Sequence, residues 1–102
     1  MKVRFDDPEL DRLETDAGFD GRLAQGVVKA FRKRMQFIRA APDERDYYAM
    51  KSLHFERLKG NRSDDHSMRL NDQWRLILRL EGEPPNKVAV IVGIEDYHGK
   101  KR

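Results

Sequence analysis

Residues 67–94 read SMRLNDQWRLILRLEGEPPNKVAVIVGI, and this stretch decides the fold class. Apolar side chains largely alternate with polar ones along 67–70 and 74–80, a spacing typical of strands with one buried face. The run 87–94 is apolar on both faces, which predicts an interior strand. Residues 71–73 (Asn-Asp-Gln) suit a hairpin loop. We therefore predict that these three strands are neighbours in one mostly antiparallel sheet.

The hairpin loop also predicts which side chains face each other. Leu70 and Trp74 lie on the same face only if the loop holds an odd number of residues. The three-residue loop satisfies this condition and places Arg69 opposite Arg75 on the other face. Two like charges directly opposite each other are destabilising unless an anion lies between them. The arginine pair is therefore the first indication of an anion-binding site.

The N-terminal half is predicted to supply an edge strand and two helices. Residues 2–5 alternate as a short edge strand, and Pro8, with Asp7 as the cap, suits the first turn of a helix. A second helix, with Asp20 as its cap, is expected to run to about Ala40, because apolar residues recur at every third or fourth position. These residues are Leu23, Val27, Phe31, Met35 and Ile38.

Residues 43–66 are polar and irregular, with one helical turn expected at 44–50. A segment of this kind inside a compact domain is often functional. We therefore predict one domain over residues 1–102. Its class is α+β: a small, mostly antiparallel sheet with two N-terminal helices packed on one face.

Composition limits the chemistry that the chain can perform. The 102 residues include no cysteine, which removes disulfides, thiolate metal sites and a cysteine nucleophile. No apolar run approaches the length of a membrane span, and the N-terminus lacks the apolar run of a signal peptide, so we expect a cytoplasmic protein.

The charges are unevenly distributed along the chain. The net charge is only +3, but acidic residues crowd the first twenty positions and the basic excess lies later. A basic region on a small domain indicates an anionic partner such as nucleic acid.

Cleavage of RNA by its own 2′-OH needs a proton acceptor, cations near the phosphate and a proton for the leaving oxygen, and no metal or other cofactor. No spacing of His, Asp and Glu indicates a metal site, and no glycine-rich phosphate-binding motif is present. The candidates are His54, Lys59, Arg62, Arg69, Arg75, Asp96, Tyr97 and His98.

The cations each have a functional and a structural interpretation. Lys59 and Arg62 flank a turn-like Gly-Asn pair and are either mobile cations for a substrate or ordinary loop charges. Arg75 lies in a central strand and needs a partner, which is a phosphate or else Glu95 or Asp96 on the next strand.

Asp96, Tyr97 and His98 form a terminal cluster in the sequence, and each of them also has a functional and a structural interpretation. His98 can exchange a proton near neutral pH, or it is a surface residue near a chain end. Tyr97 stacks on a base, or it is a core aromatic, because its position in the alternation matches Ala89, Ile91 and Gly93. Asp96 acts as a base or orients a histidine, or it caps the strand end.

The segment SLHFERLKGNRSDDHSMRLNDQWRLILRLEG (52–82), followed by VAVIVGIEDYH (88–98), resembles the HigB-type, or plasmid maintenance killer, branch of the RelE toxin superfamily. The combination of LKG, then R-x-N-x-Q-W-R, then DYH carries the resemblance, which covers nearly the whole chain. It implies a fold similar to microbial ribonucleases and ribosome-dependent, metal-independent cleavage of mRNA in the A site. It also implies a helix-turn-helix antitoxin of the HigA kind as partner, through which alone the toxin would contact operator DNA, and no membrane partner.

Carried over by position, the resemblance implies catalytic roles for Lys59, Arg75, Asp96, Tyr97 and His98. His54 occupies the place of a histidine or arginine that some relatives use upstream of the loop. RNA contacts are predicted for His54, Arg62, Arg69 and Lys100.

The chain departs from the family pattern in the loop. It has Ser63, Asp64 and Asp65 where many relatives carry a lysine and a glycine, and it has His66 where relatives often have an aromatic residue. Acids beside a phosphate-binding surface weaken the attraction for RNA. The alternatives to a nuclease are therefore a non-enzymatic inhibitor like ParE, which shares the fold, and a degenerate toxin that acts only in a regulatory complex.

Overall fold

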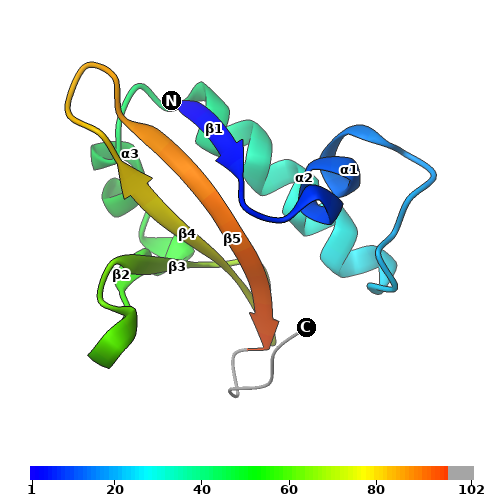
Figure 1. Cartoon of the computed structure of the whole chain (residues 1–102). Coiled ribbons are helices and arrows are strands. Elements are labelled where there is room, and N and C mark those ends of the chain that lie inside the picture. The colour runs from blue at the N-terminus through cyan, green and yellow to red at the C-terminus, as the bar shows by residue number, and fades with distance from the viewer. Residues whose placement is uncertain (97–102) are drawn as a thin grey trace.

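The computed structural model describes residues 1–96, which form one sheet with helices packed against it (Figure 1). The elements are β1 (Lys2–Phe5), α1 (Pro8–Thr15), α2 (Gln25–Ala40), α3 (Arg45–Ala49), η1 (Lys51–Leu53), β2 (Glu56–Arg57), η2 (Gly60–Arg62), β3 (Asp65–Arg69), β4 (Trp74–Glu81) and β5 (Val88–Asp96), where η marks a 3-10 turn. No helix within this part of the chain is long and apolar enough to cross a membrane.

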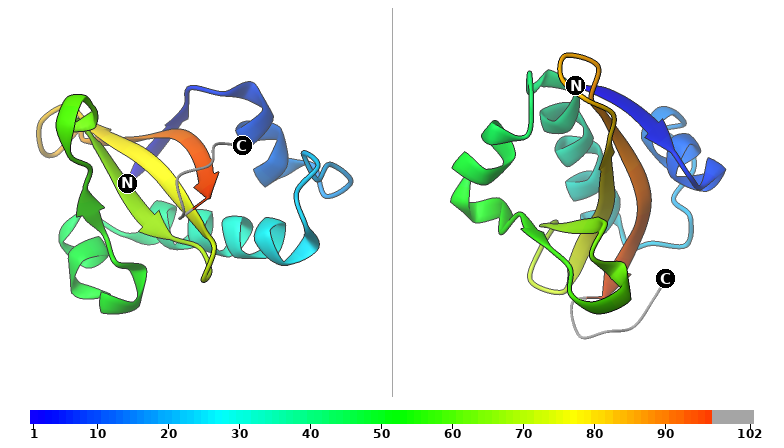
Figure 2. Two further views of the ribbon diagram at one scale, coloured as in Figure 1. Left: turned by 90° about the horizontal axis from the view of Figure 1, so that it is seen from below. Right: turned by 60° about the vertical axis from the view of Figure 1, so that its left-hand side comes forward.

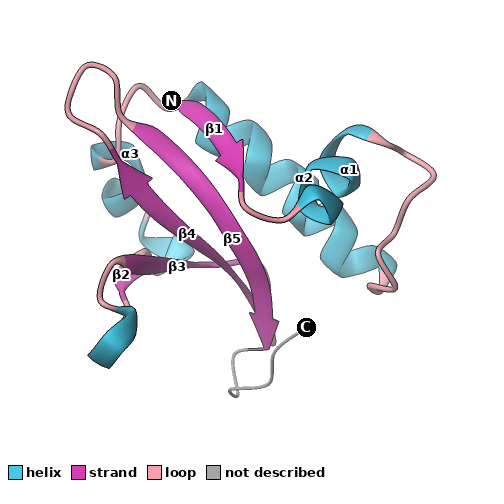
Figure 3. Ribbon diagram, in the orientation of Figure 1, coloured by secondary structure: helices cyan, strands magenta, loops and turns pink. Residues whose placement is uncertain are grey.

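The sheet has five strands in the order β1-β5-β4-β3-β2 (Figure 3). Only the β1–β5 pair is parallel, and the other three pairs are antiparallel. β1 is an edge strand and β5 is an interior strand, as the sequence predicted. The α+β class with a mostly antiparallel sheet is confirmed.

The predicted hairpin register is confirmed. Arg69 lies opposite Arg75, and the amide of Leu70 donates to the carbonyl of Trp74 at 2.9 Å. The Asn71 side chain holds the loop, because its Oδ1 accepts hydrogen bonds from the amides of Gln73 (2.9 Å) and Trp74 (2.8 Å). An asparagine that bonds to the backbone two residues on is a common way to fix a tight turn.

The pairing of β4 with β5 contains a β-bulge. Ile77 pairs with Gly93, whereas Leu78 pairs with Ile91, so Val92 has no partner on β4. A bulge places two residues of one strand opposite one of the other. Side chains beyond Val92 therefore alternate out of step with those before it.

The core lies between one face of the sheet and the helices. Figure 2 shows α2 along that face, and the stripe residues Val27, Phe31, Met35 and Ile38 of this helix are buried, as the sequence predicted. Leu23, which precedes the helix, is buried as well. α1 packs against α2 and β1. Asp7 caps α1, with its Oδ1 accepting from the amide of Glu9 at 2.9 Å.

The start of α2 differs from the sequence prediction. The helix begins at Gln25, five residues after Asp20. The Oδ1 of Asp20 accepts from the amide of Arg22 at 2.9 Å, and both Gly21 (φ 59°) and Arg22 (φ 66°) have left-handed backbone angles. Asp20 therefore stabilises a tight turn before the helix, and the prediction that it caps α2 was wrong.

The polar segment 43–66 is more ordered than the sequence indicates. The predicted helical turn is present as α3, but β2 and the two 3-10 turns were not predicted. His66 belongs to β3 and is only 5% exposed. Its ring stacks on Phe55 at a centroid distance of 4.8 Å, so His66 packs as an aromatic residue does.

Burial of His66 has a measurable consequence for stability. Burial, together with the nearby positive charge of Arg57, lowers the pKa of His66 below 6.5. The unfolded chain therefore takes up the proton first, and stability is full above about pH 6.5 and falls as the pH decreases below it, by at most about 1.4 kcal/mol per pH unit for one proton. We expect His66→Phe to flatten the decline of the melting temperature between pH 7 and pH 5. His54→Gln, at an exposed histidine, is the control and should leave the decline unchanged.

Candidate functional site

The face of the sheet opposite the α2 core carries most of the predicted cations. Arg75 and Arg79 of β4 lie on this open face, with Arg69 of β3 beside Arg75. The bulge at Val92 allows Glu95 to lie on the same face, opposite Arg75. The charged side chains therefore form a band across the strands.

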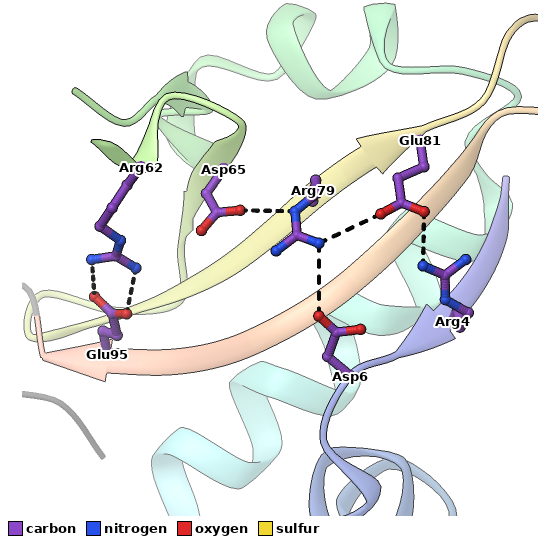
Figure 4. Close-up of polar contacts among 7 residues, drawn as sticks. All are labelled: Arg4, Asp6, Arg62, Asp65, Arg79, Glu81 and Glu95. Atoms are coloured by element: carbon purple, nitrogen blue, oxygen red, sulfur yellow. Dashed lines mark hydrogen bonds and ion pairs between the residues drawn. The ribbon is translucent and has the colours of Figure 1, made fainter. Parts of the chain in front are cut away.

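Arg62 and Arg75 converge on the carboxylate of Glu95. The guanidinium of Arg62 forms two hydrogen bonds to Glu95, at 3.0 Å from Nη1 to Oε1 and 2.6 Å from Nη2 to Oε2 (Figure 4). The Nη2 atom of Arg75 lies 3.8 Å from Oε1 of the same carboxylate. The hydrogen bonds to Glu95 raise the pKa of Arg62 above its usual value. The pair attaches η2, which carries Arg62, to the end of β5.

The like charges of Arg69 and Arg75 are compensated by carboxylates of the protein itself. Arg69 pairs with Asp72 in the hairpin loop and donates from Nε to the carbonyl of Asn71 at 3.3 Å. Arg75 is next to Glu95. The anion that the sequence required near this pair is therefore supplied, in this structure, by Asp72 and Glu95.

A second group of ion pairs centres on Arg79. Its guanidinium lies within 3.2 Å of Asp65, 3.4 Å of Glu81 and 3.8 Å of Asp6 (Figure 4). Arg4 of β1 pairs with the other oxygen of Glu81 at 2.7 Å. The hydrogen bond to Asp65 raises the pKa of Arg79. This group joins β1, β3 and β4, and its two arginines and three carboxylates carry no net positive charge.

The remaining predicted residues are not all part of this band. Lys59 is exposed and directly precedes η2, beside Arg62. His54 is exposed, two residues before edge strand β2, in a left-handed conformation with φ 48°. Tyr97, His98 and Lys100 lie outside the described residues.

Asp96 lies on the core side of the sheet. It is opposite Trp74, is 7% exposed, and accepts a hydrogen bond from Nε2 of Gln73 at 3.0 Å. Of the two acids proposed as partners of Arg75, the structure brings Glu95 to it. Asp96 is one residue further, at the end of the strand and on the other face.

The bulge also overturns the argument that Tyr97 shares a face with Ala89, Ile91 and Gly93. Ala89 and Ile91 face the core, whereas Gly93 pairs with Ile77 on the open side. The three residues therefore do not share a face. The match between Tyr97 and this set cannot support a core position for Tyr97.

Glu95, Asp65 and Arg79 are among the charged residues of this face that the sequence did not indicate as part of the site. Arg75 and Arg79 are four apart on one strand, so they share a face, and that spacing was the available signal for Arg79. Glu95 was named as a partner of Arg75, but the predicted strand ended at Ile94. Asp65 was noted as a departure from the family pattern, and it pairs with Arg79.

A cleft of about 510 Å³ borders the Arg62–Glu95 pair. Arg62, Asp65 and Glu95 lie on one side of it, and residues of the segment 7–23, which include the apolar Leu10 and Phe19 and the acids Asp7 and Glu9, lie on the other. Apolar surface beside a few fixed polar groups is typical of a binding cleft. Within residues 1–96, no three side chains of the metal-ligating types gather in one place.

Comparison with known proteins bears on the family and the fold of the chain. Residues 3–98 match the family described as the RelE-like toxin of the type II toxin-antitoxin system HigB. Among solved structures, the chain is similar to the "YoeB/ParE toxin from Agrobacterium tumefaciens", with a TM-score of 0.59 and 17% sequence identity over 95% of this chain and 99% of that one. Comparison with curated protein sequences gives no match. Since the family match spans nearly the whole chain, the protein belongs to the HigB-like family of RelE-type toxins of type II toxin-antitoxin systems.

Proposed function

We propose that the protein is a ribosome-dependent endoribonuclease that inhibits translation by cleaving mRNA in the A site. One observation carries the proposal: Arg62 and Arg75 converge on one acidic side chain at the end of β5. In the sequence, Asp96, Tyr97 and His98 follow directly. Groups able to transfer protons thus follow, along the chain, the residue that both cations contact, and cleavage by a 2′-OH requires both kinds of group.

In the proposed mechanism, the 2′-OH attacks the adjacent phosphorus and the 5′ oxygen of the next nucleotide leaves. His98 accepts the 2′ proton, and Asp96, which lies on the other face of the sheet from Arg75, orients the histidine. The leaving oxygen receives a proton from the same terminal cluster. Arg75 and Lys59 stabilise the negative charge that develops on the phosphate, and Arg62 and Arg69 position the strand. Tyr97 stacks on or orients the substrate.

Membership of the family implies a cognate antitoxin. We propose that this antitoxin is a helix-turn-helix protein similar to HigA and that it holds the toxin inactive in the cytoplasm. DNA contact would then belong to the antitoxin.

The alternative is a non-enzymatic inhibitor or a toxin that has lost activity. The internal neutralisation of the open face favours it, because every arginine of the band already has a carboxylate partner. A nuclease would require the terminal cluster for proton transfer, whereas an inhibitor would not.

Induction of the protein in cells, with mapping of mRNA 5′ ends, separates these functions. We expect growth arrest with cuts phased to codons. His98→Ala should reduce the cut frequency about 100-fold or more, the usual contribution of a proton-transfer group. Tyr97→Ala should also reduce it, because the substrate is then less well oriented. Growth arrest without codon-phased cuts would favour the inhibitor, and no arrest at all would favour the degenerate toxin.

A further inference from the structure

We propose that Glu95 occupies, in the free toxin, the position that a substrate phosphate takes between Arg62 and Arg75. RNA would bind by displacing this carboxylate. Glu95 would therefore select RNA that is held on the ribosome over RNA that is free in solution. The inference rests on the proposed function in one respect: it takes the two arginines as phosphate ligands.

The geometry of the pair supports this exchange. A carboxylate held by two parallel hydrogen bonds from one guanidinium presents two oxygens and one negative charge, and a phosphodiester presents the same. Glu95 receives both bonds from Arg62 and lies 3.8 Å from Arg75, so it connects the two cations. A phosphate in its place would contact both.

The pair is also accessible. The Arg62 side chain is 32% exposed, and it belongs to η2, a short turn on the surface. The Arg75 side chain is 20% exposed and is fixed on a central strand. Arg62 can therefore exchange one anion for another while Arg75 stays in place.

The charge of the whole face indicates what the exchange does. Arg4, Arg62, Arg69, Arg75 and Arg79 each pair with a carboxylate on the same side of the sheet. Lys59, beside Arg62, is exposed and forms no ion pair within residues 1–96. Among the described residues, RNA free in solution could contact Lys59 without breaking an ion pair, whereas each contact with these arginines would cost an existing one. An mRNA held in the ribosomal A site has a high effective concentration at the bound toxin, so it can displace the carboxylate of Glu95.

The competing explanation is that Glu95 only anchors η2. The two explanations predict opposite results for Glu95→Gln, which keeps a hydrogen-bond acceptor but removes the charge. If Glu95 competes with phosphate, the variant binds RNA more tightly. If Glu95 only holds the loop, the variant binds RNA equally or more weakly because Arg62 is less well placed.

The test is the affinity for a short single-stranded RNA that carries 2′-O-methyl groups and cannot be cleaved, measured by fluorescence anisotropy. We expect Glu95→Gln to lower the Kd about tenfold at low salt. We also expect log K to fall more steeply with log salt, by about 0.7 for each additional phosphate contact on a single strand. Thermal unfolding of the variant checks that it folds.

Glu81→Gln is the matched control. It removes the same charge from the same face, at the far end of β4, where Glu81 pairs with Arg4 and Arg79. We expect its Kd to change less than twofold. Equal effects of the two substitutions would overturn the inference, since they would reflect net charge alone, and so would weaker binding by Glu95→Gln.

A second measurement uses the unaltered protein. Titration with inorganic phosphate, followed by the NMR signals of the arginine Nε–Hε groups, should shift Arg62 and Arg75 together and saturably. Shifts that begin at Arg69 or Arg79 instead would contradict the inference.

The outcomes also distinguish this inference from the proposed function. If both tests fail and the toxin still cuts mRNA on ribosomes, the role of Glu95 is wrong and the nuclease proposal stands. If Glu95→Gln binds RNA more tightly but the wild type makes no codon-phased cuts, the nuclease proposal is wrong. The displacement of Glu95 by phosphate then still stands.

Discussion

Arg75→Ala is expected to slow mRNA cleavage on programmed ribosomes by about 100- to 1000-fold, the usual loss when a preorganised group that stabilises transition-state charge is removed. Arg75 lies on β4 in the middle of the sheet, so its guanidinium needs little reorganisation to meet the phosphate. Arg75→Lys keeps the charge but loses the planar fork, and we expect it to recover only part of the rate. Single-turnover cleavage of a defined codon measures both.

Arg4→Ala is the control for this substitution. It removes an arginine from the same face, where Arg4 is 55% exposed and pairs with Glu81 at the other end of β4. Cleavage should stay within about twofold of wild type. Thermal unfolding of Arg75→Ala should remain close to wild type, because Arg62 still holds Glu95. An Arg75→Ala protein that folds and cleaves at the wild-type rate would remove Arg75 from the site.

Phe31→Ala is expected to lower the free energy of unfolding by about 3–5 kcal/mol, as phenylalanine truncations in protein cores do. Phe31 is 0% exposed and lies in the middle of α2, against the sheet. Small domains are stable by only about 5–15 kcal/mol in total, so this one substitution removes a large part of the stability. Urea denaturation followed by circular dichroism measures the loss.

Gln36→Ala on the same helix is the control, because Gln36 is exposed. Surface substitutions of this kind usually change stability by no more than about 0.5 kcal/mol. A loss below about 1 kcal/mol for Phe31→Ala would contradict the packing of α2 on the sheet.

The sheet and the long helix were predictable because their signals are local. Alternation along β3 and β4 and the stripe on α2 depend on residues a few positions apart, and burial follows from them directly. The hairpin register followed from the parity of one loop. β2, with two residues, is too short to carry a pattern.

The start of α2 was mispredicted because one residue type serves two structures. Aspartate caps helices and also stabilises tight turns through its own backbone. Asp20 does the second, and the left-handed angles at Gly21 and Arg22 end any helical path there. The sequence contains both possibilities, and tertiary packing selects one.

In the candidate site, the sequence identified the cations better than their partners. Arg62, Arg69 and Arg75 all lie in the charged band. Which acid meets Arg75 depends on the pairing of β5 with β4 beyond Ile94, and the irregularity in that pairing has no signature in the alternation of an all-apolar run. Glu95 therefore could not be distinguished from Asp96.

The bulge that leaves Val92 unpaired sets the phase of the charged end of β5. If the ladder continued regularly through Val92, Ile94 would point to solvent and Glu95 would be buried under the helices. The bulge thus decides whether the strand presents an acid or an aliphatic side chain to the arginines. Deleting Val92 would remove the bulge and leave this phase intact, whereas inserting a residue between Gly93 and Glu95 would invert it. An insertion after the bulge, more than a substitution, would therefore redesign the site.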